Sequence, residues 1–179
     1  MFGRYKYSKT EMDKLLKSIT VLVDTREHDE KNDHILQFFD AKSIPWKKMK
    51  LDQGDYSFYV PKDEELGIIR DTYFDREIIV ERKNSLEEIS GNLSSNDRSR
   101  IKTELALAPP KKILLIENGS YKDMALGNYK TQYDKKSFLG SIHSFWHEFD
   151  LPVVFMPDRN FTGLFIINYF RYYLRGLIK

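Results

Sequence analysis

Short apolar runs alternate with amphipathic stretches along most of the chain. Strands are predicted from apolar runs rich in β-branched and aromatic residues at 19–23, 45–51, 53–60, 76–82, 111–117 and 151–157. Helices are predicted where apolar residues recur at helical spacing, at 12–19, 32–41, 101–108, 135–149 and 160–179. The run 111–117 is apolar on both faces, as expected of a strand covered by helices on both sides. The pattern therefore predicts a three-layer α/β domain, a mixed sheet flanked by helices.

Turn-forming residues divide these elements. Asp52-Gln53-Gly54 lies between two strand-like runs and predicts a tight hairpin between 45–51 and 53–60. The polar stretch 61–77 then reads as an insert before the next strand. Residues 91–97 are small and polar and predict a mobile loop, whereas 121–128 favours no one structure.

Helix starts have their own signatures. Ser8 with Glu11, and Ser85 with Glu88, have the spacing of a capping box, which predicts a helix after each serine. Asp24 follows the first strand and is consistent with a helix N-cap as well as with a functional acid.

The C-terminal helix predicted at 160–179 is apolar nearly all round. Only Asn168, Arg171 and Arg175 interrupt it, and their spacing places them on one narrow stripe. Such a helix must be covered on more than one side. Burial within one subunit is one explanation, and we favour the other, a symmetric homodimer formed through residues 160–179.

Composition limits the class of protein. A chain of 179 residues with 41% hydrophobic content is long enough for one compact domain, which we place at 20–179 after a basic, aromatic extension with a short helix at 1–19. The absence of cysteine excludes disulfides and cysteine zinc sites, and no run is long enough to span a bilayer. A cytoplasmic protein without a membrane segment is expected. The net charge of +2 does not by itself call for nucleic acid.

The candidate chemistry lies at two predicted strands. Asp55 opens one, and Glu81 and Lys83 end another on a common face, since side chains alternate along a strand. If the strands are neighbours, the two carboxylates meet, and hard oxygen ligands suit Mg²⁺ or Mn²⁺. A lysine beside such a metal can orient a water or stabilise charge developing on a phosphate. Alone, however, Glu-x-Lys is a weak signal and is more often a pair of solvated charges at a strand end.

Two further groups of residues leave their roles open. Arg98 and Arg100 follow the predicted loop, where they suit either phosphate contacts or a solvated helix start. His143 and His147 are spaced one helical turn apart, but they lie opposite the apolar face and are expected to face solvent rather than bind a metal.

Three motifs in order carry a specific resemblance. They are Val23-Asp24-Thr25-Arg26-Glu27, then Gly54-Asp55-Tyr56, then Val80-Glu81-Arg82-Lys83 followed by a Ser-Leu-Glu-Glu-Ile helix. Together they resemble the XPF-type nuclease domain, a branch of the PD-(D/E)XK nucleases with a restriction-endonuclease-like fold, and the similarity spans about residues 20–178.

The resemblance implies roles for individual residues. It implies that Asp24, Asp55 and Glu81 ligate or support Mg²⁺ or Mn²⁺ and that Lys83 works with the attacking water. It also implies that Glu27 and Arg82 complete the catalytic site. Arg26 would be a supporting residue, and Arg98 or Arg100 would contact DNA.

The chain departs from the family at two places. Glu87 stands where the family usually has aspartate, and the length left after residue 178 is too short for the tandem helix-hairpin-helix modules of many relatives. In this it resembles short stand-alone members met in phages and prophages.

The expected function is a metal-dependent endonuclease acting on branched or flapped DNA in recombination, replication or repair. A non-catalytic DNA-binding scaffold is the alternative, and the presence of all four residues Asp24, Asp55, Glu81 and Lys83 argues against it. A sequence-specific restriction enzyme ranks last, because no larger base-reading element is evident.

Overall fold

The computed structural model describes residues 6–94 and 98–178. The strands are β1 (Thr20–Val23), β2 (Trp46–Lys48), β3 (Tyr56–Val60), β4 (Thr72–Tyr73), β5 (Ile78–Lys83), β6 (Lys111–Glu117) and β7 (Val153–Met156). The helices are α1 (Lys9–Ser18), α2 (Asp29–Ala41), α3 (Leu86–Ser94), α4 (Arg98–Leu107), α5 (Tyr121–Leu126), α6 (Lys135–Phe149) and α7 (Thr162–Leu177), with 3₁₀ turns η2 (Glu64–Leu66) and η3 (Arg159–Phe161).

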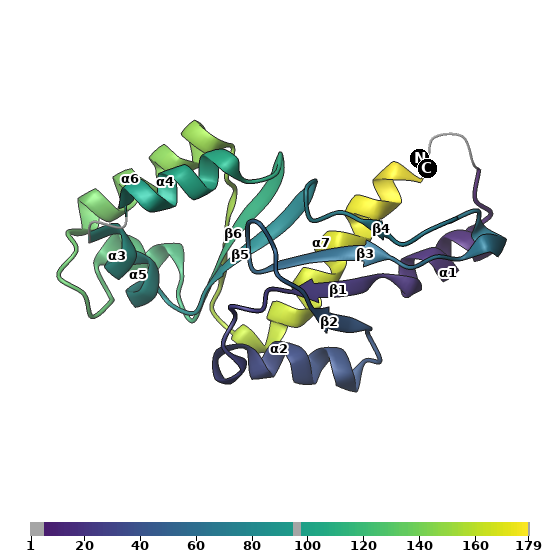
Figure 1. Cartoon of the computed structure of the whole chain (residues 1–179). Helices are drawn as coiled ribbons and strands as arrows, with labels where there is room; N and C mark the ends of the chain where they lie inside the picture. Colours follow the sequence, from purple (N-terminus) through teal and green to yellow (C-terminus); the bar gives the residue numbers. More distant parts are fainter. Residues whose placement is uncertain (1–5, 95–97, 179) are drawn as a thin grey trace.

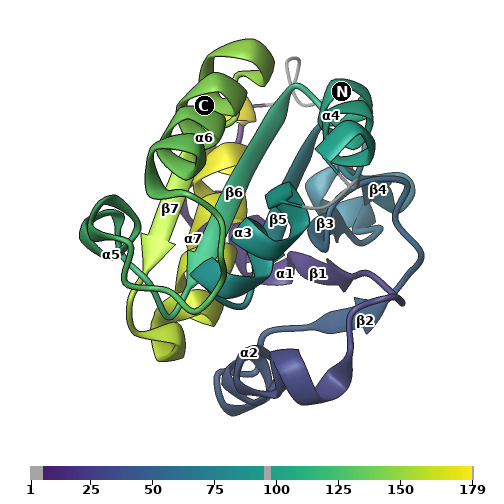
Figure 2. The same ribbon diagram turned by 90° about the vertical axis from the view of Figure 1, so that its left-hand side faces the viewer.

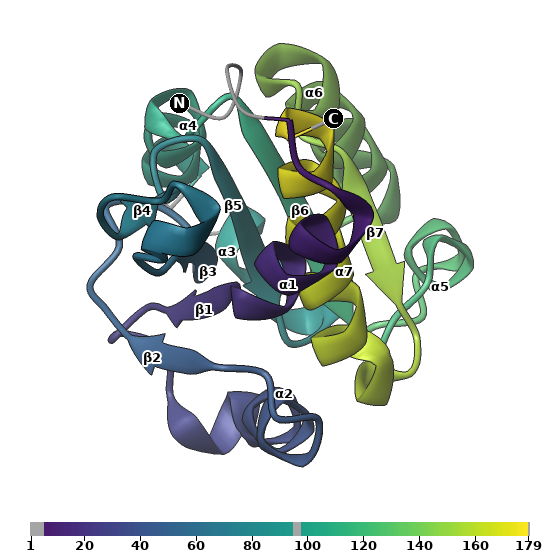
Figure 3. The ribbon, with the colours of Figure 1, turned by 90° about the vertical axis from the view of Figure 1, so that its right-hand side faces the viewer.

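These strands form one mixed sheet in the order β2-β1-β3-β5-β6-β7, with β4 paired to β3. The pairs β1–β2, β5–β6 and β6–β7 are parallel, whereas β3 is antiparallel to β1, β4 and β5. Helices α3 to α6 lie on one side of the sheet and α1, α2 and α7 on the other (Figures 1, 2 and 3). The predicted α/β class and its three layers are confirmed.

Two hydrophobic clusters hold the layers together. The larger joins α1, α2 and α7 to one face of the sheet, through residues such as Leu15, Ile35, Phe58 and Phe170. The smaller packs α3 to α6 against β6 and β7. Within the described ranges 6–94 and 98–178, no helix is long and apolar enough to cross a membrane.

Local signals placed several elements correctly. Ser8 and Glu11 form the predicted capping box of α1. Helix α6 has the predicted bounds, Lys135–Phe149, with Asp134 as its N-cap. At α3 the Ser85 hydroxyl accepts from the Glu88 N–H at 3.3 Å, but the Glu88 carboxylate reaches the N–H of Asn84 rather than that of Ser85.

The predicted hairpin between 45–51 and 53–60 is wrong. Strand β2 pairs in parallel with β1, and β1 lies between β2 and β3. The turn around Gly54 therefore leads the chain past β1 instead of folding it back on β2. The reason is non-local, since β1 is the more apolar partner and is buried along its whole length.

Other boundaries also differ from prediction. Asp24 is not the N-cap of α2, which begins after His28 and has no side-chain cap. Of the predicted mobile loop, residues 91–94 form the end of α3, and 95–97 lie outside the described residues, as do 1–5 of the N-terminal extension. The open stretch 121–128 contains the short helix α5.

Within the subunit, the C-terminal helix α7 is covered by other helices as well as by the sheet. It packs against α1 and α2 as well as β3. The predicted polar stripe is partly buried, because the half-buried Arg171 donates through Nε to the Leu16 carbonyl of α1 at 3.2 Å. Intramolecular burial thus explains part of its apolar composition.

Candidate active site

The candidate site lies where β3 and β5 separate, in the middle of the strand order. The two strands share one register pair, Tyr56 with Val80, and the Asp55 N–H donates to the Val80 carbonyl at 2.9 Å. The Asp55 carbonyl in turn accepts from the Asp24 N–H at 2.8 Å. Asp55 is thereby fixed between β1 and β5. Because β3 and β5 are central strands, the acids lie in the middle of the strand order and not on an edge strand.

A glycine precedes Asp55 because the backbone requires one. Gly54 has φ of +76°, in the left-handed region that side chains disfavour. A Cβ there would also stand 2.8 Å from Cδ1 of Ile79 on β5. The tight contact between Gly54 and Ile79 brings the start of β3 against β5 and so brings Asp55 to Glu81.

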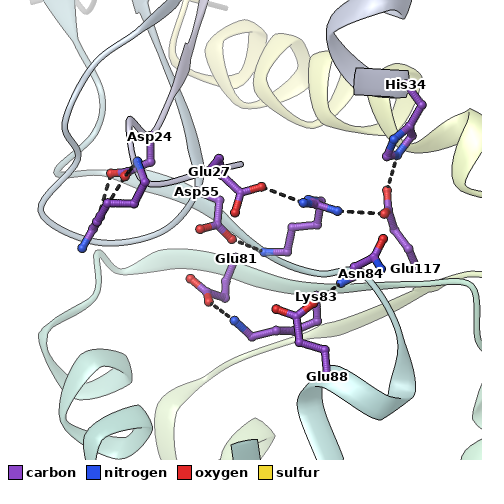
Figure 4. Close-up of polar contacts among 11 residues, drawn as sticks. Asp24, Glu27, His34, Asp55, Glu81, Lys83, Asn84, Glu88 and Glu117 are labelled. Carbon is purple, nitrogen blue, oxygen red and sulfur yellow. Dashed lines mark hydrogen bonds and ion pairs between the residues drawn. The ribbon is translucent and has the colours of Figure 1, made fainter. Parts of the chain in front are cut away.

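The carboxylates and the lysine predicted from strand alternation do meet (Figure 4). Asp55 Oδ2 accepts from the backbone N–H of Arg82 at 2.7 Å. Lys83 Nζ donates to Glu81 Oε1 at 2.7 Å, and the two side chains are 16% and 28% exposed. This group of Asp55, Glu81 and Lys83, the carboxylate–lysine cluster, can therefore reach solvent and a substrate.

The charges in the carboxylate–lysine cluster are strongly coupled. Burial, followed by the negative charges of Glu81 and Glu27, raises the pKa of Asp55 well above its usual range. Burial acts to lower the pKa of Lys83, but the charges of Glu81 and Asp55 outweigh it and the net pKa is raised. Lys83 is thus a cation at neutral pH, and ionising Asp55 would place a second negative charge beside the Glu81 carboxylate that already binds the Lys83 ammonium.

Arg82 points away from this cluster, to the other face of β5, as strand alternation requires. Its guanidinium is 2% exposed and donates to Glu117 at 2.9 Å and to Glu27 at 2.7 Å. His34 Nε2 of α2 lies 2.8 Å from the second oxygen of Glu117. These contacts, which run from Glu27 through Arg82 and Glu117 to His34, connect four segments: strand β5, strand β6, helix α2 and the loop that follows β1. They lie directly behind the carboxylate–lysine cluster.

Sequence reasoning placed Glu27 and Arg82 in the site and missed Glu117 and His34. A signal for Glu117 exists, since it ends the apolar strand β6, which lies parallel to β5. An acid at that position is completely buried and needs a cation partner. His34 has no comparable sequence signal.

Asp24 has a different environment from Asp55 and Glu81. Its carboxylate oxygens accept from Arg26 Nε at 2.8 Å and Arg26 Nη2 at 2.9 Å, and from the Leu51 N–H at 2.8 Å. Burial acts to raise the pKa of Asp24, but these hydrogen bonds and the charge of Arg26 lower it overall. Figure 4 shows Asp24 turned away from Glu81.

The two arginines after the predicted loop lie on α4 and differ in position. Arg100 lines a cavity of about 60 Å³ together with Glu81 and Lys83, and its Nε lies 3.6 Å from Glu104. Arg98 lies over the ring of Phe145, with Cζ 6.0 Å from the centroid. The geometry thus associates Arg100, rather than Arg98, with the carboxylate–lysine cluster. His143 and His147 are exposed on α6, as expected.

The donor set fits a divalent cation in part. Asp55 and Glu81 supply hard oxygen atoms, and a cation between them would relieve the repulsion that adds to burial in raising the pKa of Asp55. Across residues 6–94 and 98–178, no three acid or histidine side chains are arranged to hold a metal, and Asp24 is bound to Arg26. A metal held by Asp24, Asp55 and Glu81 together would require Asp24 to leave Arg26.

The fold is thus an α/β domain with a mixed sheet between two helical layers, and two acids and a lysine meet where its central strands separate. The family model described as the ERCC4 domain matches residues 23–169, and the chain belongs to this family of structure-specific DNA nucleases. The comparison with curated protein sequences finds no match.

Solved structures with the same fold include XPF from Aeropyrum pernix and XPF from Aeropyrum pernix in complex with DNA. The TM-score is 0.61 for both, with 19% and 16% sequence identity, and each covers 88% of this chain. The chain spans 66% and 65% of the length of those two chains, just under two thirds.

Proposed function

We propose that this protein is a Mg²⁺- or Mn²⁺-dependent endonuclease that hydrolyses phosphodiester bonds in branched or flapped DNA during recombination, replication or repair. The observation that carries the proposal is the meeting of Asp55, Glu81 and Lys83 where β3 and β5 separate. Membership of the ERCC4 domain family supports a nuclease that acts on DNA structure. The solved XPF complex with DNA supports DNA as the substrate.

The metal would be held by the carboxylates of Asp55 and Glu81, with Asp24 as a third ligand if it leaves Arg26. A bound divalent cation lowers the pKa of a water and stabilises negative charge on a phosphoryl group. Glu81 would then exchange part of its interaction with Lys83 for the cation, and Lys83 would become available to the substrate.

Lys83 acts as a donor in this proposal. Because its pKa is raised, Lys83 keeps its proton at neutral pH and does not serve as a base. Its ammonium orients the attacking water or stabilises the charge that develops on the scissile phosphate. Arg82 and Glu27 do not contact the substrate but hold β5 against the loop after β1. Arg26 and Arg100 are the proposed phosphate contacts nearest to the site.

The decisive experiment measures cleavage of labelled flap, fork, four-way-junction and blunt duplex DNA with Mg²⁺, Mn²⁺, Ca²⁺ or EDTA. Asp55→Asn and Lys83→Ala test the cluster, and Lys102→Met is a matched control for the loss of a surface lysine that pairs with Glu148 on α6. We expect metal-dependent cutting of a branched substrate by the wild type and Lys102→Met, and none by the other two.

The contrasting results are equally informative. Binding of branched DNA without cleavage in any metal would refute the nuclease and favour the scaffold. Equal cutting by wild type and Asp55→Asn would show that the activity does not come from this site. Cutting of blunt duplex as fast as of branched DNA would contradict the proposed structure specificity.

We also propose a homodimer formed through residues 160–179. Leu164 and Tyr172 on α7 are 42% and 69% exposed and would be covered in such a dimer. A groove of about 360 Å³ runs beside them, lined by Ile78, Lys111, Phe165, Asn168, Tyr169, Tyr172 and Tyr173.

Sedimentation velocity tests the dimer. Tyr172→Glu should shift the protein to monomer, whereas Tyr121→Glu, which changes a tyrosine 48% exposed on α5, should leave the dimer intact. A wild type that sediments as a monomer over the full concentration range would refute the proposal.

A further inference from the structure

Three side chains from three strands meet on the sheet, outside the carboxylate–lysine cluster. Lys47 comes from β2, Tyr59 from β3 and Tyr73 from β4, and we name these three residues the tyrosine platform. Tyr59 and Tyr73 are cross-strand partners in the sheet register. Their rings are stacked, with centroids 4.9 Å apart and planes inclined by 14°. The insert between β3 and β5 therefore contributes to the tyrosine platform, since its strand β4 supplies one of the two rings.

Lys47 adds a positive charge held in a fixed place. Its Nζ lies 4.0 Å from the centroid of Tyr59 and 5.0 Å from that of Tyr73, and it donates to the Tyr73 hydroxyl at 3.0 Å. The hydrogen bond to Tyr73 acts to raise the pKa of Lys47, burial opposes it, and the net pKa is raised. A cation and two flat rings are therefore presented together.

The tyrosine platform lies on the same face of the sheet as the carboxylate–lysine cluster. Side chains two and four residues apart in a strand share a face, so Tyr59 lies on the face of Asp55. Phe58 points to the other face and packs in the cluster of α1, α2 and α7. Four residues of strand, at about 3.3 Å each, place Tyr59 roughly 13 Å from Asp55.

The layer formed by α3 to α6 does not pack on this half of the sheet face, although Leu22 and Ser57 on it are buried. Of the described residues of β1 to β4, none belongs to the hydrophobic cluster that α3 to α6 form on β6 and β7. Figure 2 shows α3, α5 and α6 on the side of β5 to β7, and none of the four helices in front of β1 and β2. Tyr73 is 41% exposed. A ring that is flat, exposed and supported from behind by a second ring can accept another flat group.

The spacing and the chemistry suit a single strand of nucleic acid. A base that is free of a duplex can stack on an aromatic ring, and a neighbouring cation can hold its phosphate. Bases within a duplex are already stacked on one another and have no face to offer. At about 3.4 Å or more per nucleotide, the distance from Asp55 corresponds to a few nucleotides.

We propose that Lys47, Tyr59 and Tyr73 bind the single-stranded segment of the DNA substrate, with a base stacked on Tyr73 and a phosphate at Lys47. The inference rests on the proposed function in that the bound strand leads to the carboxylate–lysine cluster. The tyrosine platform would then select substrates with a single-stranded segment next to the duplex that is cut.

Binding in EDTA tests the tyrosine platform without cleavage. The probe is a labelled oligothymidylate of about 15 nucleotides, compared with a blunt duplex, by fluorescence anisotropy. Tyr73→Leu removes the ring but keeps an apolar side chain, and Tyr73→Phe keeps the ring. We expect Tyr73→Leu to weaken binding of the single strand by about fivefold or more, Tyr73→Phe to stay close to wild type, and neither to change duplex binding.

Lys47→Gln and Lys48→Gln form a second matched pair. The two lysines are adjacent in β2 and point to opposite faces of the sheet, so both variants lose the same charge. We expect Lys47→Gln to weaken single-strand binding more and to lower its salt dependence by about one counterion. Circular dichroism checks that all variants fold.

The outcomes separate this inference from the proposed function. Equal affinity of Tyr73→Leu, Tyr73→Phe and wild type for the oligothymidylate would overturn the inference, as would equal losses for single strand and duplex. No binding of the oligothymidylate by the wild type would also overturn it. The binding assay contains EDTA and does not depend on cleavage. A protein that binds the oligothymidylate through Tyr73 but cuts no DNA in the metal-containing cleavage assay would refute the nuclease and leave the tyrosine platform standing.

Discussion

Replacing Arg82 with methionine removes the cation that two carboxylates share. Methionine replaces the aliphatic part of the arginine side chain without its charge, and the backbone N–H of residue 82 can still donate to Asp55. Glu117, which is fully buried, keeps His34 but loses its only arginine partner among the ion pairs of the described residues, and Glu27, 17% exposed, loses the guanidinium that it binds. Breaking a buried ion pair on one side costs about 3–5 kcal/mol, because the remaining charge is uncompensated.

Urea unfolding followed by circular dichroism measures this cost as a free energy of unfolding, and thermal unfolding measures it as a change in Tm. In a protein of this size each kcal/mol lowers Tm by about 2–4 °C, so Arg82→Met should lose roughly 6–20 °C. The control is Lys102→Met, which breaks a pair with Glu148 at a similar distance, 2.8 Å, but with side chains 39% and 43% exposed. That exposed pair should contribute about 0–1 kcal/mol.

A double variant tests the cause. Adding Glu117→Gln to Arg82→Met removes the uncompensated charge and should recover part of the lost stability. Equal losses for Arg82→Met and Lys102→Met, or no recovery in the double variant, would refute the view that burial gives the Arg82 network its strength.

Three further changes have clear expected results. Asp55→Asn should raise the free energy of unfolding in EDTA by about 0.5–2 kcal/mol at neutral pH, since the raised pKa means that ionised Asp55 opposes folding; a lower Tm in scanning fluorimetry would contradict this. The pKa of Glu117 is lowered from 4.5, so the ionised carboxylate contributes its full stabilisation at pH values above 4.5. The difference in free energy of unfolding between wild type and Glu117→Gln should therefore shrink in urea titrations as the pH falls below 4.5. A difference that stays constant would be the contrary result. Gly163→Ala should cost about 1–3 kcal/mol, because its Cβ would stand 2.6 Å from Cδ1 of Phe38, whereas Gly140→Ala, with open space on α6, should stabilise by up to about 1 kcal/mol; thermal unfolding that ranks them in reverse would show that the α7–α2 contact is not tight.

The sequence by itself determined the features that depend on local geometry. Glu81 and Lys83 share a face because side chains alternate along any strand, and the caps of α1 and α6 follow from residues within one turn of each helix. The order of the three motifs was enough to identify the family, which the match over residues 23–169 confirmed.

Only the tertiary structure decided which strands are neighbours and which charges are buried together. Strand β1 lies between β2 and β3, contrary to the predicted hairpin, because pairing is set by which apolar faces become buried together rather than by closeness in sequence. The same holds for His34 and Glu117, 83 residues apart and in contact at 2.8 Å. Such contacts form only when the sheet and its two helical layers are assembled, because burial then requires each charge to find a partner, and no local pattern encodes the partner.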